Sequence, residues 1–356
     1  MVETRGNLDR VTIADGTLTL EGWAATLGAG SVEGFRVTCA GAELTNLEVA
    51  TGLPSPDVKA IHPHLDGAGG CHFRVRAGLN GLKPAQARSS VISLTPLASR
   101  QDGRILIHLV EPVLPTPRDE DIRTVGGGDV LSVSNWFLGH FIQLADLQPD
   151  AHVLDVGCGF GRVAYSLAHY LEPTARYEGF DILGELIEWA QQSISTRFPN
   201  FTFRKANIFN KWYNPKGALK AVDYRFPYED ACFDLIFLTS VFTHMQGTEV
   251  RHYLDEICRV LRPGGRCLTT CFLLDAESER LIRKGKSTQN LVHPFDDCYA
   301  SNTKAPENAI GFKENLLLGW IAERGLTLTH KYYGTWCGRP HVLDYQDILV
   351  YKKPAA

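Results

Sequence analysis

An aspartate and three glycines stand together in the stretch VLDVGCGFGRV, residues 153–163. Glycine has no Cβ atom, so it allows a sharp turn and the close approach of a ligand to the backbone; the three are Gly157, Gly159 and Gly161. The spacing is G-x-G-x-G, whereas the dinucleotide fingerprint is G-x-G-x-x-G, and Arg162 takes the place of its third glycine. Asp155 adds a fixed negative charge, which repels a pyrophosphate and suits a ligand that carries an amino group.

A second acid, Asp181, ends the next predicted strand, YEGFDI. A carboxylate at this place in a nucleotide-binding sheet reaches the ribose and can accept a hydrogen bond from both of its hydroxyls. The same side chain can cap the helix that follows. The two roles are compatible, and we expect Asp181 to bind a ribose.

Strands and helices alternate from about residue 125 onward. Strands are predicted at 153–156, 177–182, 201–208, 233–240, 266–274, 326–334 and 345–353, and helices at 135–147, 160–171, 183–198, 249–261 and 312–325. The first helix after the glycines should begin at about Phe160, and Gly325 should end the last one. Such alternation indicates a doubly wound parallel sheet, with ligands bound beyond the carboxyl ends of its strands.

The first 110 residues have a different pattern. Short apolar-alternating runs recur between Gly, Asn, Asp and Pro, which predicts a small all-β sandwich or jelly roll. The stretch EPVLPTPRDED, with three prolines, is typical of a linker. We therefore divide the chain into an accessory β-domain at 1–110, a linker at 111–124 and an α/β domain at 125–356.

Several motifs in order resemble the class I S-adenosylmethionine-dependent methyltransferases, over about 125–275. They are VLDVGCGFGR, FDIL, KANIF, FPYEDACFDLIFLTSVFTHM and YLDEICRVLRPGGR. The resemblance implies a Rossmann-like sheet of seven strands, parallel except for an antiparallel last strand. It also implies S-adenosyl-L-methionine as the cofactor.

The resemblance implies a role for each matched residue. The backbone of the three glycines would hold the methionine part, Asp155 would orient that region, and Asp181 would bind the ribose hydroxyls. The residues implied beside adenine or the methionine amino group are Ile182, Asn207, Ile208 and Thr239. Asn207 stands where aspartate is commoner, and for Asn207 and Thr239 local turn or cap polarity is an equal alternative.

The acceptor should lie among the loops that follow strands four, five and six. His244, in SVFTHM, is the candidate general base, because an imidazole can take a proton from an alcohol near neutral pH. The alternative is a histidine that fixes the loop through a backbone hydrogen bond. Candidate substrate residues are His293, Tyr333, Trp336 and Arg339, and His293 and His341 are weaker candidates for the base. Trp336 and the adjacent tyrosines can equally form a packed hairpin.

The segment 275–309 looks long and irregular, which is typical of a lid or binding insert. Asp296 and Asp297 within it lack a third ligand at useful spacing, so we expect no metal.

Composition excludes several classes of protein. The formal net charge of −4 favours neither a general nucleic-acid binder nor a polybasic membrane contact. We find no apolar stretch long enough to span a bilayer and no signal-peptide core. Nine cysteines without a CxxC pair indicate reduced thiols. We expect a cytoplasmic protein. The sequence is compatible with an oligomer.

Two N-terminal stretches resemble small β-domains of bacterial glycan-assembly enzymes: DGTLTLEGWAA and SPDVKAIHPHLDGAGGCHFRVRAGL. The resemblance is loose, because CHFRV stands where those domains usually have glycine–phenylalanine. Trp23 would be a core anchor or a sugar-stacking face. The resulting hypothesis is O-methylation of a sugar hydroxyl of a bacterial glycan or glycoconjugate. Alternatives are a small-molecule O- or N-methyltransferase and a non-catalytic cofactor-binding assembly module; a nicotinamide oxidoreductase is disfavoured by the glycine spacing.

Overall fold

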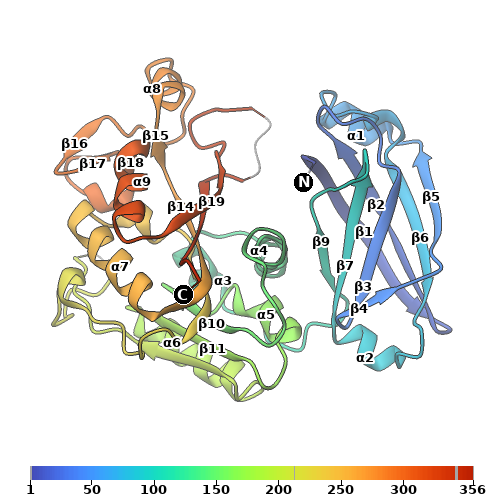
Figure 1. Ribbon diagram of the computed structural model, residues 1–356, viewed down its shortest axis with the longest axis horizontal. Coiled ribbons are helices and arrows are strands. Elements are labelled where there is room, and N and C mark those ends of the chain that lie inside the picture. The colour runs from blue at the N-terminus through green and yellow to red at the C-terminus, as the bar shows by residue number, and fades with distance from the viewer. Residues whose placement is uncertain (1, 212, 341–343, 356) are drawn as a thin grey trace. The chain divides into compact units, whose positions relative to one another are not determined.

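The computed structural model describes residues 2–211, 213–340 and 344–355. The chain divides into two compact units, Met1–Gln143 with Arg162–Glu172, and Leu144–Gly161 with Pro173–Ala356. Figure 1 shows their elements. Among the described residues, no helix is both long and apolar enough to cross a bilayer.

The first unit is built on two antiparallel sheets (Figure 1). One sheet has the order β1-β2-β6-β5, with strands β1 Thr4–Ala14, β2 Thr17–Thr26, β6 His72–Gly78 and β5 Glu48–Leu53. The other has the order β4-β3-β7-β8 with β9 also paired to β7, and its strands are β4 Ala42–Leu44, β3 Gly34–Cys39, β7 Val91–Ala98, β8 Gln101–Asp102 and β9 Leu106–Leu109.

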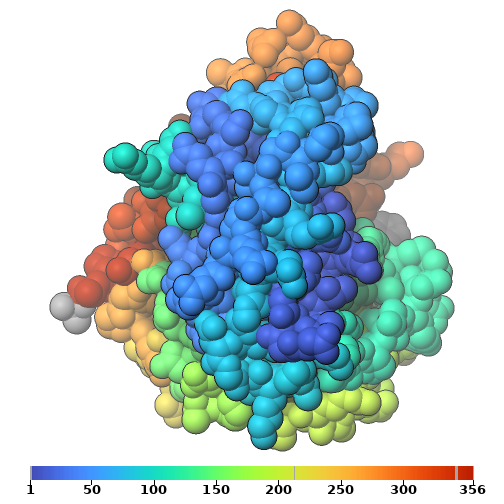
Figure 2. All heavy atoms as spheres, turned by 90° about the vertical axis from the view of Figure 1, so that its right-hand side faces the viewer, coloured from blue at the N-terminus to red at the C-terminus, as the bar shows by residue number. Residues whose placement is uncertain are grey.

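The two sheets share one hydrophobic core. Apolar residues alternate with exposed ones along β6, as expected for a strand with one buried face. Leu20 and Val75 of one sheet pack in the same cluster as Val37 and Leu94 of the other. The predicted β-sheets of the N-terminal part are therefore confirmed, with two short helices, α1 Pro56–Ile61 and α2 Pro84–Arg88, between their strands. Figure 2 views the unit from the side of the edge strand β5, all of whose residues are exposed.

Short helices complete the first unit: α1 Pro56–Ile61, α2 Pro84–Arg88, α3 Asp119–Thr124, most of α4 Val130–Ala145, and α5 Ala164–Tyr170. α3 lies within the stretch expected to be a linker. The predicted start of a helix at Phe160 is wrong, because α5 begins only at Ala164. Gly161 has a φ of +80°, and a residue with that backbone conformation cannot continue a right-handed helix.

The second unit contains a seven-stranded sheet in the order β12-β11-β10-β13-β14-β20-β19. Its strands are β10 His152–Val156, β11 Arg176–Asp181, β12 Phe201–Lys205, β13 Phe233–Leu238, β14 Leu261–Cys271, β19 Thr327–Tyr332 and β20 Asp347–Lys352. The pairs from β12 to β14 are parallel, and β20 is antiparallel to both neighbours. The mixed α/β fold with an antiparallel last strand is confirmed.

Strand order reverses beside β10, which has β11 on one side and β13 on the other. Such a switch point leaves a crevice at the carboxyl ends of the strands. β13 is buried at nearly every position, which explains its unbroken apolar sequence. Helices of this unit include α6 Gly184–Ala190, followed by a π-helical turn at Gln191–Ser195, α7 Gly247–Val260 and α9 Glu314–Glu323. Gly325, with a φ of +70°, follows α9 as predicted.

The prediction of an irregular segment at 275–309 is wrong. It contains α8 Ala276–Arg283 and two strands of a second sheet, which has the order β15-β18-β17-β16. Its strands are β15 Leu273–Leu274, β16 His293–Phe295, β17 Cys298–Ala300 and β18 Ile310–Lys313. These strands are only two to four residues long, too short for periodicity to reveal them. All nine cysteines are unpaired in the structure.

Candidate functional site

The turn after β10 is held by the neighbouring strand β11. The three glycines of the turn have positive φ angles: +79° at Gly157, +55° at Gly159 and +80° at Gly161. The N–H groups of Gly157 and Cys158 donate to the Phe180 carbonyl at 2.9 and 3.1 Å. A pyrophosphate cradle needs such N–H groups to face the ligand. Here they are already used within the protein, which fits a ligand without phosphate better.

Asp181 joins the end of β11 to the glycine turn. One carboxylate oxygen accepts from the N–H of Gly159 at 2.8 Å, and the other accepts from the N–H of Leu183 at 2.9 Å. The side chain is half-buried at the carboxyl edge of the sheet. Burial raises its pKa, and the backbone N–H groups oppose that rise. An oxygen with two lone pairs can still accept from a ribose hydroxyl.

Asp155 lies beneath the turn in the core. It is 1% exposed, and one oxygen accepts from the Tyr177 hydroxyl at 2.6 Å. The other oxygen has no hydrogen-bond partner among the described residues. Burial raises the pKa of Asp155 to about 8, with the Asp181 charge adding to the rise. Burial therefore favours the neutral form of this carboxyl over the fixed negative charge expected from the sequence.

The loop after β13 packs against the glycine turn. A Cβ atom on Gly157 would come within 2.5 Å of the Cγ2 atom of Val241, so glycine is needed there for space as well as for its φ angle. Thr239, one residue beyond β13, is half-buried. The glycine turn and the loop that carries His244 are therefore neighbours.

The three residues expected beside adenine lie at the ends of β11 and β12. Ile182 packs on the main hydrophobic core and is half-buried. Ile208 is buried and forms an isolated bridge with Leu219. Asn207 is exposed, and its backbone carbonyl accepts from the N–H of Leu219 at 3.1 Å. With Asp181 and the glycine turn, these residues fit S-adenosylmethionine, as the resemblance implies.

A polar cluster at the ends of β13, β14 and β20 was not predicted from the sequence. The N–H of Ser240 donates to Thr270 Oγ1 at 2.8 Å, Thr270 Oγ1 donates to Gln346 Oε1 at 2.5 Å, and Gln346 Nε2 donates to Ser240 Oγ at 3.0 Å. Ser240 has a φ of +63°, which is uncommon for a residue with a side chain. This φ ends β13 two residues earlier than predicted. The three side chains lie where the acceptor is expected.

His244 lies in the 3₁₀ turn Phe242–His244 and is half-buried. Its Nδ1 atom is 2.7 Å from the carbonyl oxygen of Glu307. A carbonyl can only accept, so Nδ1 carries the hydrogen and Nε2 of the neutral ring carries the lone pair. The bond that fixes the loop is therefore the same bond that orients a base, and the two roles proposed from the sequence are compatible.

The predicted substrate residues of the β19–β20 loop occupy different environments. Trp336 is fully buried, and its Nε1 donates to Asp347 at 2.8 Å. It is thus part of the packed hairpin, and its ring is closed to a substrate in this structure. Tyr333 is half-buried and donates to Glu314 at 2.7 Å. Arg339 is buried, pairs with Asp275, and lies 4.0 Å above the Tyr333 ring.

His293 begins β16 and is half-buried; His341 lies outside the described residues. The structure places His293 on the small sheet, whereas Tyr333 donates to Glu314 and Arg339 pairs with Asp275. Among the described residues, no group of three or more His, Cys, Asp or Glu side chains could hold a metal ion. Asp297 pairs instead with Arg251 at 2.6 Å.

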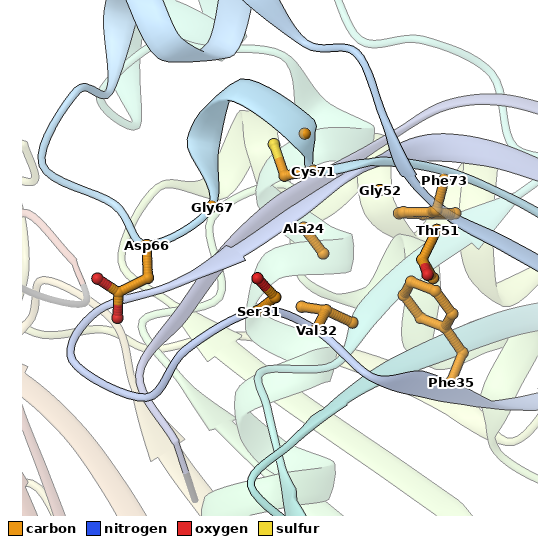
Figure 3. Close-up of a pocket in the computed structure, with 11 residues that line it drawn as sticks. Ala24, Ser31, Val32, Phe35, Thr51, Gly52, Asp66, Gly67, Cys71 and Phe73 are labelled. Atoms are coloured by element: carbon orange, nitrogen blue, oxygen red, sulfur yellow. The ribbon is translucent and has the colours of Figure 1, made fainter.

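The first unit has a small hollow of its own, shown in Figure 3, with a volume of about 120 Å³. Phe35 and Phe73 line one side of it, and Ser31, Asp66 and Cys71 line the other. The Asp66 carboxylate is used by the chain itself, since it accepts from the N–H groups of two residues of the 27–31 loop at 2.9 and 3.2 Å. Trp23 is half-buried and stacks on His62 at 5.4 Å between ring centroids.

Comparison with known proteins gives one family match. A family model described as "Methyltransferase domain" matches residues 147–325, half of the chain. The match covers the glycine turn, Asp181, His244 and the strands β10 to β18, but not β19 or β20.

Curated relatives with this domain include two bacterial enzymes. A demethylmenaquinone methyltransferase from Symbiobacterium thermophilum is 27% identical over 44% of this chain and 56% of that protein. A 27-O-demethylrifamycin SV methyltransferase from Amycolatopsis mediterranei is 28% identical over 50% of this chain and 63% of that protein. The chain thus spans less than two thirds of the length of either relative. A solved SAM-dependent methyltransferase from Methanosarcina mazei is 19% identical over 59% of this chain and 95% of that chain, with a TM-score of 0.39.

Proposed function

Because the chain belongs to the methyltransferase-domain family, we propose that it transfers the methyl group of S-adenosylmethionine to a hydroxyl group of a small organic acceptor. The single observation that carries this proposal is the hydrogen bond between Gly159 and Asp181. It joins the turn expected to hold the methionine part to the carboxylate expected to bind the ribose. S-adenosylmethionine supplies an electrophilic methyl group on a positively charged sulfur.

The chain's residues then divide the work of binding. Asp181 accepts from the ribose hydroxyls, and the glycine turn leaves room for the methionine part. Ile182 and Ile208 border the adenine ring, with Asn207 and Thr239 as polar neighbours. Asp155 acts from below, by fixing β10 and β11 to each other through Tyr177. Alignment of donor and acceptor is the main catalytic task in such a displacement.

We propose His244 as the general base. The proton of the acceptor hydroxyl passes to Nε2, while the bond from Nδ1 to Glu307 keeps the ring in one orientation. Tyr333 and His293 are half-buried and can contact the acceptor. Trp336 and Arg339 contribute by holding the β19–β20 loop, because both are buried.

A small-molecule acceptor is supported by two of the relatives, whose names give a demethylmenaquinone and a demethylrifamycin as what they methylate. A sugar or glycan acceptor, expected from the sequence, has no support among them. We retain the division into 1–110, 111–124 and 125–356 as a proposal. Under this division, the β-domain assists binding of one of three partners: an acceptor, another protein or a second copy of the chain.

The test is transfer of labelled methyl from S-adenosylmethionine to a panel of a naphthoquinol, a polyketide alcohol, an amine and an oligosaccharide. We expect transfer to a hydroxyl of one of the first two, and loss of transfer in Asp181→Ala. Glu229→Ala, at an exposed acid of the same unit, is the matched control. Label on the oligosaccharide alone would restore the glycan hypothesis. Cofactor binding without transfer to any acceptor would favour an assembly module.

A further inference from the structure

The loop that follows β12, residues 207–220, exposes an unusual set of apolar side chains. Phe209 is 51% exposed, Tyr213 is 45% exposed and Leu219 is 42% exposed. Large apolar side chains are usually covered, so three of them within eleven residues form a distinct surface feature. Trp212 lies outside the described residues, and no step below depends on it.

The same loop is strongly basic. Lysines occur within it at 211, 216 and 220 and just before it at 205, all of them exposed, and no Asp or Glu occurs from 189 to 222. The net charge of −4 for the whole chain conceals this local excess of positive charge.

The loop is held in shape by its own backbone. Phe209 N–H donates to the Leu219 carbonyl at 2.7 Å, and Asn210 and Asn214 exchange hydrogen bonds at 3.0 and 3.1 Å. Gly217 passes so close to Ile208 that a Cβ atom would lie 2.3 Å from its carbonyl carbon. The apolar side chains are therefore exposed on an ordered, hydrogen-bonded loop.

We propose that the loop 207–220 docks the protein on an anionic membrane surface. Lysines attract acidic lipid headgroups, and aromatic and aliphatic side chains enter the interface between headgroups and acyl chains. A nucleic acid is the competing partner for a basic, aromatic surface. Lysines attract the phosphates of either partner, but the aliphatic side chain of Leu219 cannot stack on a base, whereas it can enter the interface between headgroups and acyl chains. The membrane therefore fits better.

The proposal does not depend on methyl transfer. The loop begins at Asn207 and Ile208, which are expected to border adenine, so docking would place the cofactor site next to the membrane. A hydrophobic acceptor dissolved in the bilayer could then be reached without leaving it.

The test is sedimentation of the full chain with vesicles of phosphatidylcholine alone or mixed with phosphatidylglycerol. We expect binding to the mixed vesicles only. The triple variant F209S/Y213S/L219S, which keeps every lysine, should lower the partition coefficient by at least about tenfold. The variant K211Q/K216Q/K220Q keeps the apolar side chains and should bind mixed vesicles as poorly as neutral ones.

Matched controls come from exposed residues elsewhere in the same unit. V292S/F295S removes apolar side chains that are 44% and 36% exposed, and K284Q/K286Q/K304Q removes three exposed lysines. Both should bind as the parent does. Thermal unfolding of each variant shows whether it is folded, and the two loop variants test the proposal independently of each other.

Equal binding by parent and loop variants, or no binding to mixed vesicles, would overturn the proposal. A single-stranded RNA oligonucleotide, followed by fluorescence anisotropy, tests the competing partner. RNA binding that is lost in K211Q/K216Q/K220Q, together with no vesicle binding, would assign the loop to nucleic acid instead.

Discussion

The Asp181 carboxylate accepts a hydrogen bond from the backbone N–H of Gly159 at 2.8 Å. The acid at the end of one strand therefore fixes the glycine turn at the end of the neighbouring strand. A change at Asp181 should affect the turn as well as the ribose contact, which makes this residue the most sensitive probe of the cofactor site.

Replacement of Asp181 by alanine should weaken the binding of S-adenosylmethionine about 10- to 100-fold, because hydrogen bonds to a charged group contribute about 1.5–3 kcal/mol. Isothermal titration calorimetry measures the change. Glu229→Ala should bind with the affinity of the parent. Unchanged affinity in Asp181→Ala would show that the ribose lies elsewhere.

Replacement of Gly157 by alanine should cost more stability than replacement of Gly264. Both glycines have a positive φ, +79° and +83°, and an alanine pays about 1–2 kcal/mol in that region. Only at Gly157 would the new Cβ also meet Val241, whereas Gly264 has nothing within 4 Å. Denaturant unfolding measures both.

The added Val241→Ala change should recover part of the stability lost in Gly157→Ala, because it removes the atom that the new Cβ would meet. No recovery in the double variant would show that the backbone conformation, and not the contact, decides the loss.

The stability of the protein should fall as pH rises from about 4 to about 8 through the contribution of Asp155. Its pKa is raised from 3.8 to about 8 in the folded state, so in this range the folded chain holds a proton that the unfolded chain releases. Asp155→Asn has no carboxyl to titrate, so its melting temperature should decline less over this range, by on the order of 5 °C. Identical pH profiles for the two proteins would contradict a buried neutral carboxyl.

Replacement of His244 by asparagine should lower kcat by about 10²–10⁴-fold with little change in cofactor affinity. The asparagine amide can still donate to the Glu307 carbonyl from near the position of Nδ1, so the loop is kept while the base is lost. Added imidazole should restore part of the rate if His244 is the base. A variant that is as active as the parent would leave His244 a purely structural role.

Trp336→Phe should destabilise the protein by about 1–3 kcal/mol, because it leaves one bond of the buried Asp347 carboxylate unmade. The KM for the acceptor should change little. A large rise in KM at unchanged stability would show instead that the Trp336 ring contacts the substrate. Substrate contact was one of the two roles predicted from the sequence; a packed hairpin was the other.

Much of the fold was readable in the sequence because its signals are local. Alternating strands and helices predicted the sheet, and unbroken apolar sequence predicted the buried strand β13. The short strands at 293–295 and 298–300 were missed, since three residues carry no periodicity. The start of α5 was placed too early, because nothing local showed that Gly161 adopts a φ of +80°.

By itself the sequence determined the residue types that a cofactor site requires: glycines that permit the turn after β10, and an acid at the end of β11. Only the tertiary structure decided their states. It buried Asp155 beneath the turn, joined Asp181 to Gly159, closed Trp336 into the core and assembled Ser240, Thr270 and Gln346. The reason is physical: desolvation and hydrogen bonding depend on neighbours that lie 22 to 106 residues away along the chain.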